Sequence, residues 1–167
     1  MRDSASAAAI DSAIARLTAA SARTEILAEL HPPRKFGPFR RAPRMTRLGS
    51  VWRLGVLLLA PDGRLYATGQ VIRAADPRHP NFTSASGEVR REIREAARAA
   101  GLPPGETVDF DAAPIELDAD TPGGPVVRVG DELRVSWNGS RSLDSLVPFG
   151  RYLTERVELL ADPPEGA

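Results

Sequence analysis

Apolar positions along the chain mark a hairpin within residues 51–73. An unbroken apolar run at 56–59 precedes the turn-forming residues Pro61, Asp62 and Gly63, and apolar residues then alternate over 65–72. The continuous run predicts a central strand that is buried on both faces. The alternation predicts a half-buried strand. We therefore expect two strands joined at 61–64 that form a globular core. This hairpin carries no nucleophile, metal cluster or phosphate loop.

A 3.6-residue apolar period predicts three helices. The first covers residues 4–30 and would end at His31-Pro32-Pro33, because proline cannot continue the hydrogen-bond ladder. The second begins with Ser86 as N-cap and runs to about residue 100, where Gly101 ends it. The third covers residues 146–160. The apolar stripe of the first helix is Ile10, Ile14, Leu17, Ile26, Leu27 and Leu30. That of the second helix is Val89, Ile93, Ala96, Ala97 and Ala100, and that of the third is Leu146, Phe149, Leu153, Val157 and Leu160.

Further short strands are predicted between the second and third helices. Residues 108–117 form a strand interrupted at Pro114, residues 126–129 form another, and residues 133–137 follow it, with a hairpin turn at 138–139. Sequential short strands favour an α+β fold, with a mostly antiparallel sheet of about five strands, helices packed on one face, and an N-terminal helix. We divide the chain into a helical segment at 1–31, a basic Pro/Arg-rich linker at 32–47, an α+β domain at 48–162 and a frayed tail at 163–167.

Composition excludes several kinds of chemistry. The 167 residues include no cysteine, so disulfides, zinc–thiolate sites and thiol catalysis are excluded. No apolar run approaches the roughly 20 residues of a membrane helix, and the N-terminus lacks a signal-peptide pattern. We therefore expect a cytoplasmic protein that does not enter the membrane. The glycines form no phosphate-binding fingerprint, and no cofactor is predicted.

Charge is distributed unevenly along a chain whose formal net charge is zero. Residues 1–53 hold 10 basic and 4 acidic groups, residues 101–167 hold 5 basic and 13 acidic groups, and no acid occurs between Leu30 and Pro61. The linker interleaves Phe36 and Phe39 with basic residues, which is typical of a site for an anionic partner. Its candidate anion-binding residues are Arg34, Lys35, Arg40, Arg41, Arg44 and Arg47. The alternative is a solvated linker whose phenylalanines pin it to the core and whose arginines pair with the acidic third of the chain, which we favour because no nucleic-acid-binding motif accompanies the basic residues.

One loop suggests a hydrolase. His79 lies near Asp76, Ser84 and Ser86, and a loop histidine beside a serine can act as a general base that activates the hydroxyl. The only other histidine is His31. The alternative is a surface histidine between turn-forming prolines, which we favour because no nucleophile-elbow pattern is present.

Spaced acids and two tryptophans carry weaker signals. Carboxylates of this kind can bind a divalent cation, but a solvated strand face is the simpler interpretation, and no metal site is predicted. The acids are Asp109, Asp111, Glu116, Asp118 and Asp120. Trp52 and Trp137 can line a ligand pocket, although core or half-buried packing is favoured in a chain with few aromatic residues.

The block RLGSVWRLGVLLLAPDGRLYATGQVIRA, together with REIREAARAAGLPPGETVDFDAAPI, resembles a group of small uncharacterised proteins from high-GC actinobacteria. The resemblance covers most of the chain after residue 45 and implies no activity. LLLAPDGRLYATG is also similar to the first hairpin of Nudix hydrolases. We reject that family because the glutamates of GEVRREIREAARAAG lack the spacing of its paired metal ligands.

Three hypotheses about function follow. The first is a non-enzymatic binding or protein-interaction module, whose N-terminal helix packs on its own domain, on a protein partner or on a second copy of the chain. The second is a small hydrolase that uses His79. The third is a nucleic-acid-binding protein that uses the basic residues of 34–53.

Overall fold

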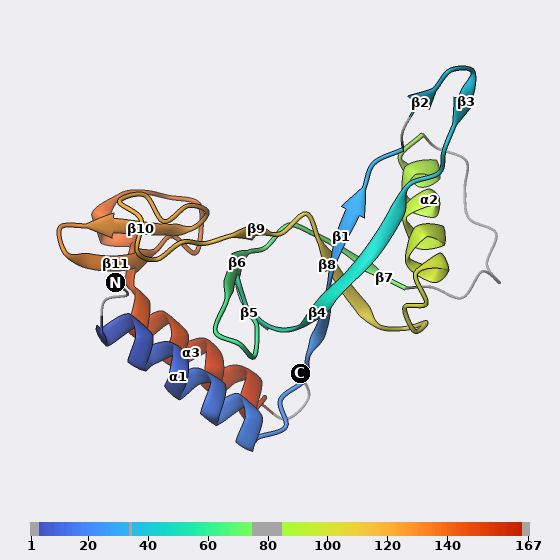
Figure 1. The fold of residues 1–167 in the computed structure, drawn as a ribbon. Coiled ribbons are helices and arrows are strands. Elements are labelled where there is room, and N and C mark those ends of the chain that lie inside the picture. The colour runs from blue at the N-terminus through green and yellow to red at the C-terminus, as the bar shows by residue number, and fades with distance from the viewer. Residues whose placement is uncertain (1–3, 34, 75–84, 165–167) are drawn as a thin grey trace. The chain divides into compact units, whose positions relative to one another are not determined.

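The computed structural model describes residues 4–33, 35–74 and 85–164, and of residues 35–36, 39–40 and 85–86 it describes the backbone alone. These residues form an α+β fold with three α-helices and sheets of seven, three and two strands (Figure 1). The seven-stranded sheet has the order β7-β8-β1-β4-β5-β6-β9 and is mostly antiparallel, with one parallel pair, β1 with β8. The α+β class and the N-terminal helix are confirmed. The expectation of about five strands was too low, and the parallel pair was not predicted.

The chain divides into two compact units, each made of segments that are not contiguous in sequence. Unit 1 contains residues 1–24, 51–68 and 113–167, and unit 2 contains residues 25–50 and 69–112. Strand β4 (Arg44–Leu54) gives its first seven residues to unit 2 and its last four to unit 1. Each unit has its own cluster of buried apolar side chains.

Unit 1 packs two helices and short strands around one core. Its helices are α1 (Ser4–Ala19) and α3 (Phe149–Ala161), with a 3-10 turn at Leu143–Ser145. Its strands are the end of β4, β5 (Leu57–Leu59), β6 (Leu65–Ala67), β9 (Ala113–Pro114), β10 (Val126–Val129), β11 (Glu132–Val135) and β12 (Val147–Pro148). Strand β5 lies between β4 and β6, and all three of its leucines are fully buried. The predicted central, two-sided burial of this strand is confirmed.

The turn at residues 60–64 forms as expected. Pro61 occupies the second turn position, the Gly63 N–H donates to the Ala60 carbonyl over 2.9 Å, and Gly63 adopts a φ of 82° that suits glycine. The Asp62 carboxylate accepts hydrogen bonds from the backbone N–H and the side chain of Arg64. The residues Pro61-Asp62-Gly63 after β5 therefore specify the turn through their own backbone preferences.

A second reversal, which no turn signal in the sequence predicted, divides the expected first strand of this hairpin. Leu54 pairs with Leu57, so Gly55 and Val56 form a two-residue loop between β4 and β5. Gly55 has a φ of 67°. The buried Tyr152 hydroxyl of α3 accepts the Val56 N–H over 3.0 Å and donates to the Leu54 carbonyl over 3.0 Å. The loop needs no polar residue of its own, because a side chain from α3 satisfies its backbone.

Helix α1 is shorter than predicted. It ends at Ala19, Ser21 adopts a φ of 50°, and the Ala22 N–H donates back to the Leu17 carbonyl over 2.9 Å, which closes the helix. The residues expected to continue the helix form strand β1 (Glu25–His31) instead. Ile10, Ala13 and Leu17 are buried in the core of unit 1, and α1 lies beside α3 (Figure 1). The N-terminal helix therefore packs on its own chain.

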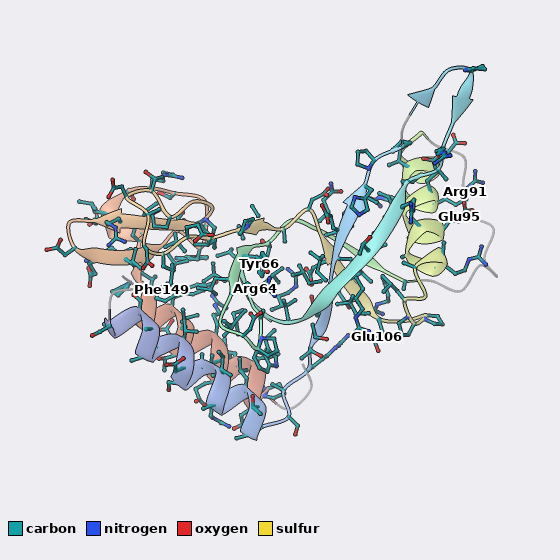
Figure 2. The ribbon with its side chains drawn as sticks, in the orientation of Figure 1. Arg64, Tyr66, Arg91, Glu95, Glu106 and Phe149 are labelled. Atoms are coloured by element: carbon teal, nitrogen blue, oxygen red, sulfur yellow. The ribbon has the colours of Figure 1, made fainter. Side chains whose placement is uncertain are left out.

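Unit 2 packs one helix on a small sheet. It contains β1, the first part of β4, β7 (Gln70–Arg73), α2 (Ala85–Ala99) and β8 (Thr107–Phe110), together with a hairpin of β2 (Lys35–Phe36) and β3 (Phe39–Arg40). Helix α2 is confirmed, but it begins at Ala85, so Ser86 lies within its first turn and not at the expected N-cap. It buries Ile93, Ala96 and Ala97, whereas Val89 is 54% exposed, and Arg91 and Glu95 lie on its solvent side (Figure 2). Gly101 ends it with a φ of 74°.

Two expectations, one about the linker at 32–47 and one about a hairpin at 138–139, were wrong. Residues 32–47 are not an irregular linker throughout, because they contain the β2–β3 hairpin and the start of β4. The strand at 133–137 ends at Val135, and no hairpin forms at 138–139. There the Ser136 hydroxyl donates to the Ser140 carbonyl over 2.6 Å, and the Asn138 side chain accepts the Ser140 N–H. These side-chain hydrogen bonds to the backbone thus take the place of the strand-to-strand hydrogen bonds that a hairpin would form.

Candidate functional site

A cavity of about 290 Å³ in unit 2 lies where β1 ends and β4 begins. Six described residues line this His31 cavity, namely His31, Pro32, Arg41, Ala42, Arg44 and Thr46. Prolines 32 and 33 end β1, and the β2–β3 hairpin then returns the chain alongside it. Arg44 and Thr46 alternate along β4 with the buried Met45, so both lie on the exposed face of the strand.

The lining of the His31 cavity is rich in hydrogen-bond donors. The His31 Nε2 atom lies 3.0 Å from the Thr46 hydroxyl and 3.8 Å from the Glu29 carboxylate. Arg41 and Arg44 each add a guanidinium group that can only donate. None of the six lining residues is acidic, so the cavity presents two fixed positive charges, an imidazole and a hydroxyl to a ligand.

The contacts of His31 differ from those of a nucleophile-activating triad. In a triad one ring nitrogen faces the hydroxyl while an acid holds the opposite nitrogen, which fixes the tautomer. Here Thr46 and Glu29 both approach Nε2 of His31. Glu29 therefore does not orient the ring from the other side, and the arrangement suits binding better than nucleophilic catalysis.

The cavity contains part of the predicted anion-binding set. Arg41 and Arg44 line it, whereas Arg47 is exposed and donates to the Ser50 hydroxyl over 3.3 Å. Lys35 and Arg40 pair across the β2–β3 hairpin, and Arg34 lies outside the described residues. His31 and Thr46 also belong to the site, and no sequence pattern predicts the two together. The sequence predicts His31-Pro32-Pro33 as the end of a helix and offers His31 only as the second histidine that a histidine-dependent mechanism could use.

The hydrolase hypothesis concerns residues that the structure does not describe. Asp76, His79 and Ser84 lie outside the described residues, and the side chain of Ser86, in the first turn of α2, is not described. This hypothesis stays a prediction.

Asp109 and Asp111, two of the spaced acids, do not share a solvent-exposed strand face. Asp109 is completely buried in β8, between β1 and β7, whereas Asp111 is exposed, has a φ of 56° and accepts a hydrogen bond from the Gln70 amide over 3.0 Å. The common face expected for these two acids was therefore wrong. Within the described ranges, no group of three or more histidines and acids is arranged to hold a metal ion.

The two tryptophans also differ. Trp52 is 5% exposed, belongs to the core of unit 1 and donates its indole N–H to the Ala22 carbonyl over 3.3 Å, as packing predicts. Trp137 is 50% exposed, so it lies outside the core and about half of its surface is covered, within the core or half-buried packing expected for it.

A second hollow, of about 190 Å³, runs between α1 and α3 and offers less to a charged ligand. Its charged residues, Arg16 and Glu158, already form a two-armed ion pair, with both N···O distances 3.1 Å. The hydrogen bond from Arg16 lowers the pKa of Glu158 below its usual value. A similar bond from Arg64 lowers the pKa of Asp62 in the exposed turn of the β5–β6 hairpin, where Figure 2 marks Arg64. Both shifts belong to structural ion pairs.

The Arg16–Glu158 pair gives a prediction about pH. Because the folded-state pKa of Glu158 is lowered, the stabilisation is present above the pKa of an unfolded glutamate, about 4.3, and is lost as the pH falls through the lower folded value. We expect Glu158→Gln to lower the melting temperature slightly at pH 7, because the pair is exposed, and this difference to shrink as the pH is lowered below about 4.3. Glu155→Gln, which removes a pair within α3, is the control. A Glu158→Gln difference that stays constant as the pH falls from 7 to the lowest pH at which the protein remains folded would contradict the assignment.

Comparisons with known proteins identify no relative. No family model matches the chain, and no curated protein or solved structure shows significant similarity to it. Among the described residues, no helix is long and apolar enough to cross a bilayer.

Proposed function

We propose that this protein is a non-enzymatic binding module whose His31 cavity binds a phosphate-bearing ligand. The observation that carries the proposal is the convergence of Arg41 and Arg44 on one hollow beside the His31 imidazole and the Thr46 hydroxyl. A cytoplasmic location is part of the proposal, since the chain lacks cysteine.

The donor set favours phosphate over a singly charged carboxylate. Each guanidinium can donate two parallel hydrogen bonds to a pair of oxygens, and a phosphate offers enough oxygens and charge for two arginines at once. The Thr46 hydroxyl and the imidazole can contact the remaining oxygens. At about 290 Å³ the cavity is near the lower limit for a small-molecule site, so it fits a phosphate group and the first atoms attached to it.

The test is titration calorimetry of the full chain with inorganic phosphate, pyrophosphate and a nucleoside monophosphate at low salt. We expect Arg41→Ala and Arg44→Ala each to weaken binding about tenfold or more, because a hydrogen bond to a charged group contributes about 1.5–3 kcal/mol. Arg47→Ala is the matched control, because Arg47 is an exposed arginine on the same strand as Arg44 but outside the cavity. It should leave affinity unchanged within about twofold.

Two results would overturn the proposal. One is the absence of phosphate binding by the wild type at low salt. The other is an equal loss in all three variants, which would indicate a diffuse charge effect rather than a site. Circular dichroism of each variant checks that the fold is intact.

A further inference from the structure

Strand β4 has a free edge in unit 2, within the described part of the chain. Strand β1 lies on one side of β4, and β5 lies on the other side but pairs only with residues 52–54. Among the residues that the structure describes, 44–50 therefore have no neighbouring strand on the β5 side. Backbone N–H and C=O groups along such an edge are available to another extended chain. This free edge begins at the His31 cavity, because Arg44 and Thr46 line the cavity.

An exposed leucine follows the cavity residues along β4. Side chains alternate between the two faces of a strand, so Arg44, Thr46 and Leu48 share one face. Met45, which alternates with them, is buried in the same cluster as Ile93 of α2, so the shared face points away from α2. Leu48 is 52% exposed, and two residues of a strand span about 7 Å. A ligand that extends from the cavity along β4 therefore meets an apolar side chain next.

The donors of the His31 cavity suit a phosphate monoester better than a phosphate diester. A guanidinium that donates two parallel hydrogen bonds needs two oxygens, so two guanidinium groups can share the three terminal oxygens of a monoester. A diester, which is the form of phosphate inside a nucleic acid chain, has fewer terminal oxygens and less negative charge. Arg41 and Arg44 supply the two guanidinium groups. The cavity therefore favours a phosphate that is attached through a single oxygen.

We infer that the ligand is a phosphorylated serine or threonine in an extended segment of a partner protein, which adds to the free edge of β4 as a further strand. This inference rests on the proposed phosphate binding. The phosphate occupies the His31 cavity, the peptide backbone pairs with residues 44–50, and an apolar side chain two positions from the phosphorylated residue covers Leu48. Addition to a strand edge and recognition of phosphate by clustered arginines are both general modes of peptide binding.

A peptide fits this edge better than a nucleic acid strand does. A peptide carries N–H donors and C=O acceptors at the spacing of a strand, whereas a sugar–phosphate chain has no N–H donors for the carbonyls of β4. The six described residues that line the cavity include no phenylalanine, tyrosine or tryptophan on which a base could stack. No acidic residue occurs in the chain from 31 to 60, so this segment attracts an anionic peptide.

The experiment measures fluorescence anisotropy of a labelled heptapeptide with the full chain at low salt. The peptide has a central phosphoserine, a leucine two positions to either side of it and threonine elsewhere, so it serves either strand direction. We expect it to bind about tenfold or more tightly than both free phosphoserine and the unphosphorylated peptide, because each lacks part of the contact.

Peptides that are N-methylated at alternate backbone nitrogens test the strand pairing. Alternate N–H groups of an added strand point toward β4 and the others point away from it. One alternate set of N-methyl groups should therefore weaken binding about tenfold or more, whereas the other set should change it by less than about twofold.

Leu48→Ser and a matched control test the apolar contact. Leu48→Ser should weaken the heptapeptide about fivefold and leave free phosphoserine unchanged, because Leu48 lies outside the cavity lining. Val89→Ser changes an apolar residue of similar exposure, 54%, on α2 of the same unit, and should leave both affinities unchanged within about twofold. Replacing both leucines of the peptide with serine should remove the effect of Leu48→Ser, since the contact is then already absent.

The outcomes separate this inference from the proposed function. If Arg41→Ala and Arg44→Ala weaken the binding of inorganic phosphate and phosphoserine but the heptapeptide binds no more tightly than phosphoserine, the inference fails and the phosphate site stands. The inference also fails if both N-methylated sets bind equally, or if Leu48→Ser binds the heptapeptide normally. An RNA hexamer with a terminal phosphate that binds more tightly than the heptapeptide would likewise overturn it. If neither phosphate nor the heptapeptide binds, both proposals fail.

Discussion

Gly55→Ala is expected to lower the free energy of unfolding by about 3 kcal/mol. Gly55 has a φ of 67°, a conformation that costs other residues about 1–2 kcal/mol. A Cβ atom there would also overlap the Tyr152 hydroxyl, and overpacking of a closed site costs about 1–3 kcal/mol. The hydroxyl cannot simply move away, because it holds Val56 and Leu54 through the two hydrogen bonds of the β4–β5 loop. Urea denaturation followed by circular dichroism measures the loss.

Two companion variants separate the causes. Gly130→Ala meets the same positive φ but open space, so it should show the conformational cost alone. Tyr152→Phe removes the obstructing hydroxyl and leaves two backbone groups without their partner, at about 1–3 kcal/mol. The double variant with Gly55→Ala should lose less than the sum of the two, since the overlap is relieved. Strict additivity would show that the Tyr152 hydroxyl does not limit this loop.

Gly69→Ala is expected to destabilise unit 2 by about 3 kcal/mol for a different reason. The φ of Gly69 is unremarkable for other residues, but a Cβ atom would meet the backbone carbonyls of Phe110 and Asp111. These atoms belong to the end of β8 and the bend after it, and moving them would disturb the β7–β8 ladder.

The chain supplies a matched control for Gly69→Ala. Gly49, in β4 of the same unit, also lacks a positive φ and has open space around its Cβ position. Gly49→Ala should be neutral or stabilising by about 0.4–1 kcal/mol, because it restricts the unfolded chain. Equal destabilisation by the two substitutions in thermal unfolding would contradict the close approach at Gly69.

Local signals in the sequence were sufficient for several elements. Pro61-Asp62-Gly63 specifies its turn, Gly101 ends α2, and Pro114 limits β9 to a short edge piece. In each case the residue acts through its own backbone preferences, which do not depend on distant contacts.

Elements that depend on distant partners were not predictable. Ile26, Leu27 and Leu30 fit a helical stripe, and they become a strand because β8, some 80 residues later, pairs with it in parallel. The Gly55 loop carries no polar turn signal, because Tyr152 of α3 provides its hydrogen bonds. Residues 25–31 and 54–57 are therefore positions where tertiary structure overrides the local pattern.

The candidate site was predictable in part. The run of basic residues predicts anion binding by Arg41 and Arg44, since charge density is visible without a fold, and both residues line the His31 cavity. The contribution of His31 and Thr46 depends on the pairing of β1 with β4 in the sheet, which brings the end of one strand beside the start of the other. No spacing in the sequence encodes that pairing.

The interleaved composition of the two units has a consequence for synthesis on the ribosome. All segments of unit 2 have been translated by residue 112, whereas unit 1, which begins with α1, must wait for α3 at residues 149–161. From the end of α1 at residue 19 to the end of α3 at residue 161 is 142 residues, so at about 5–20 residues per second the apolar face of α1 stays without its final partner for about 7–28 seconds. Because the chain is synthesised from its N-terminus, unit 2 can therefore finish folding before unit 1, although unit 1 begins first in the sequence. A chaperone that shields Ile10 and Leu17 during that interval would raise the yield of folded chain.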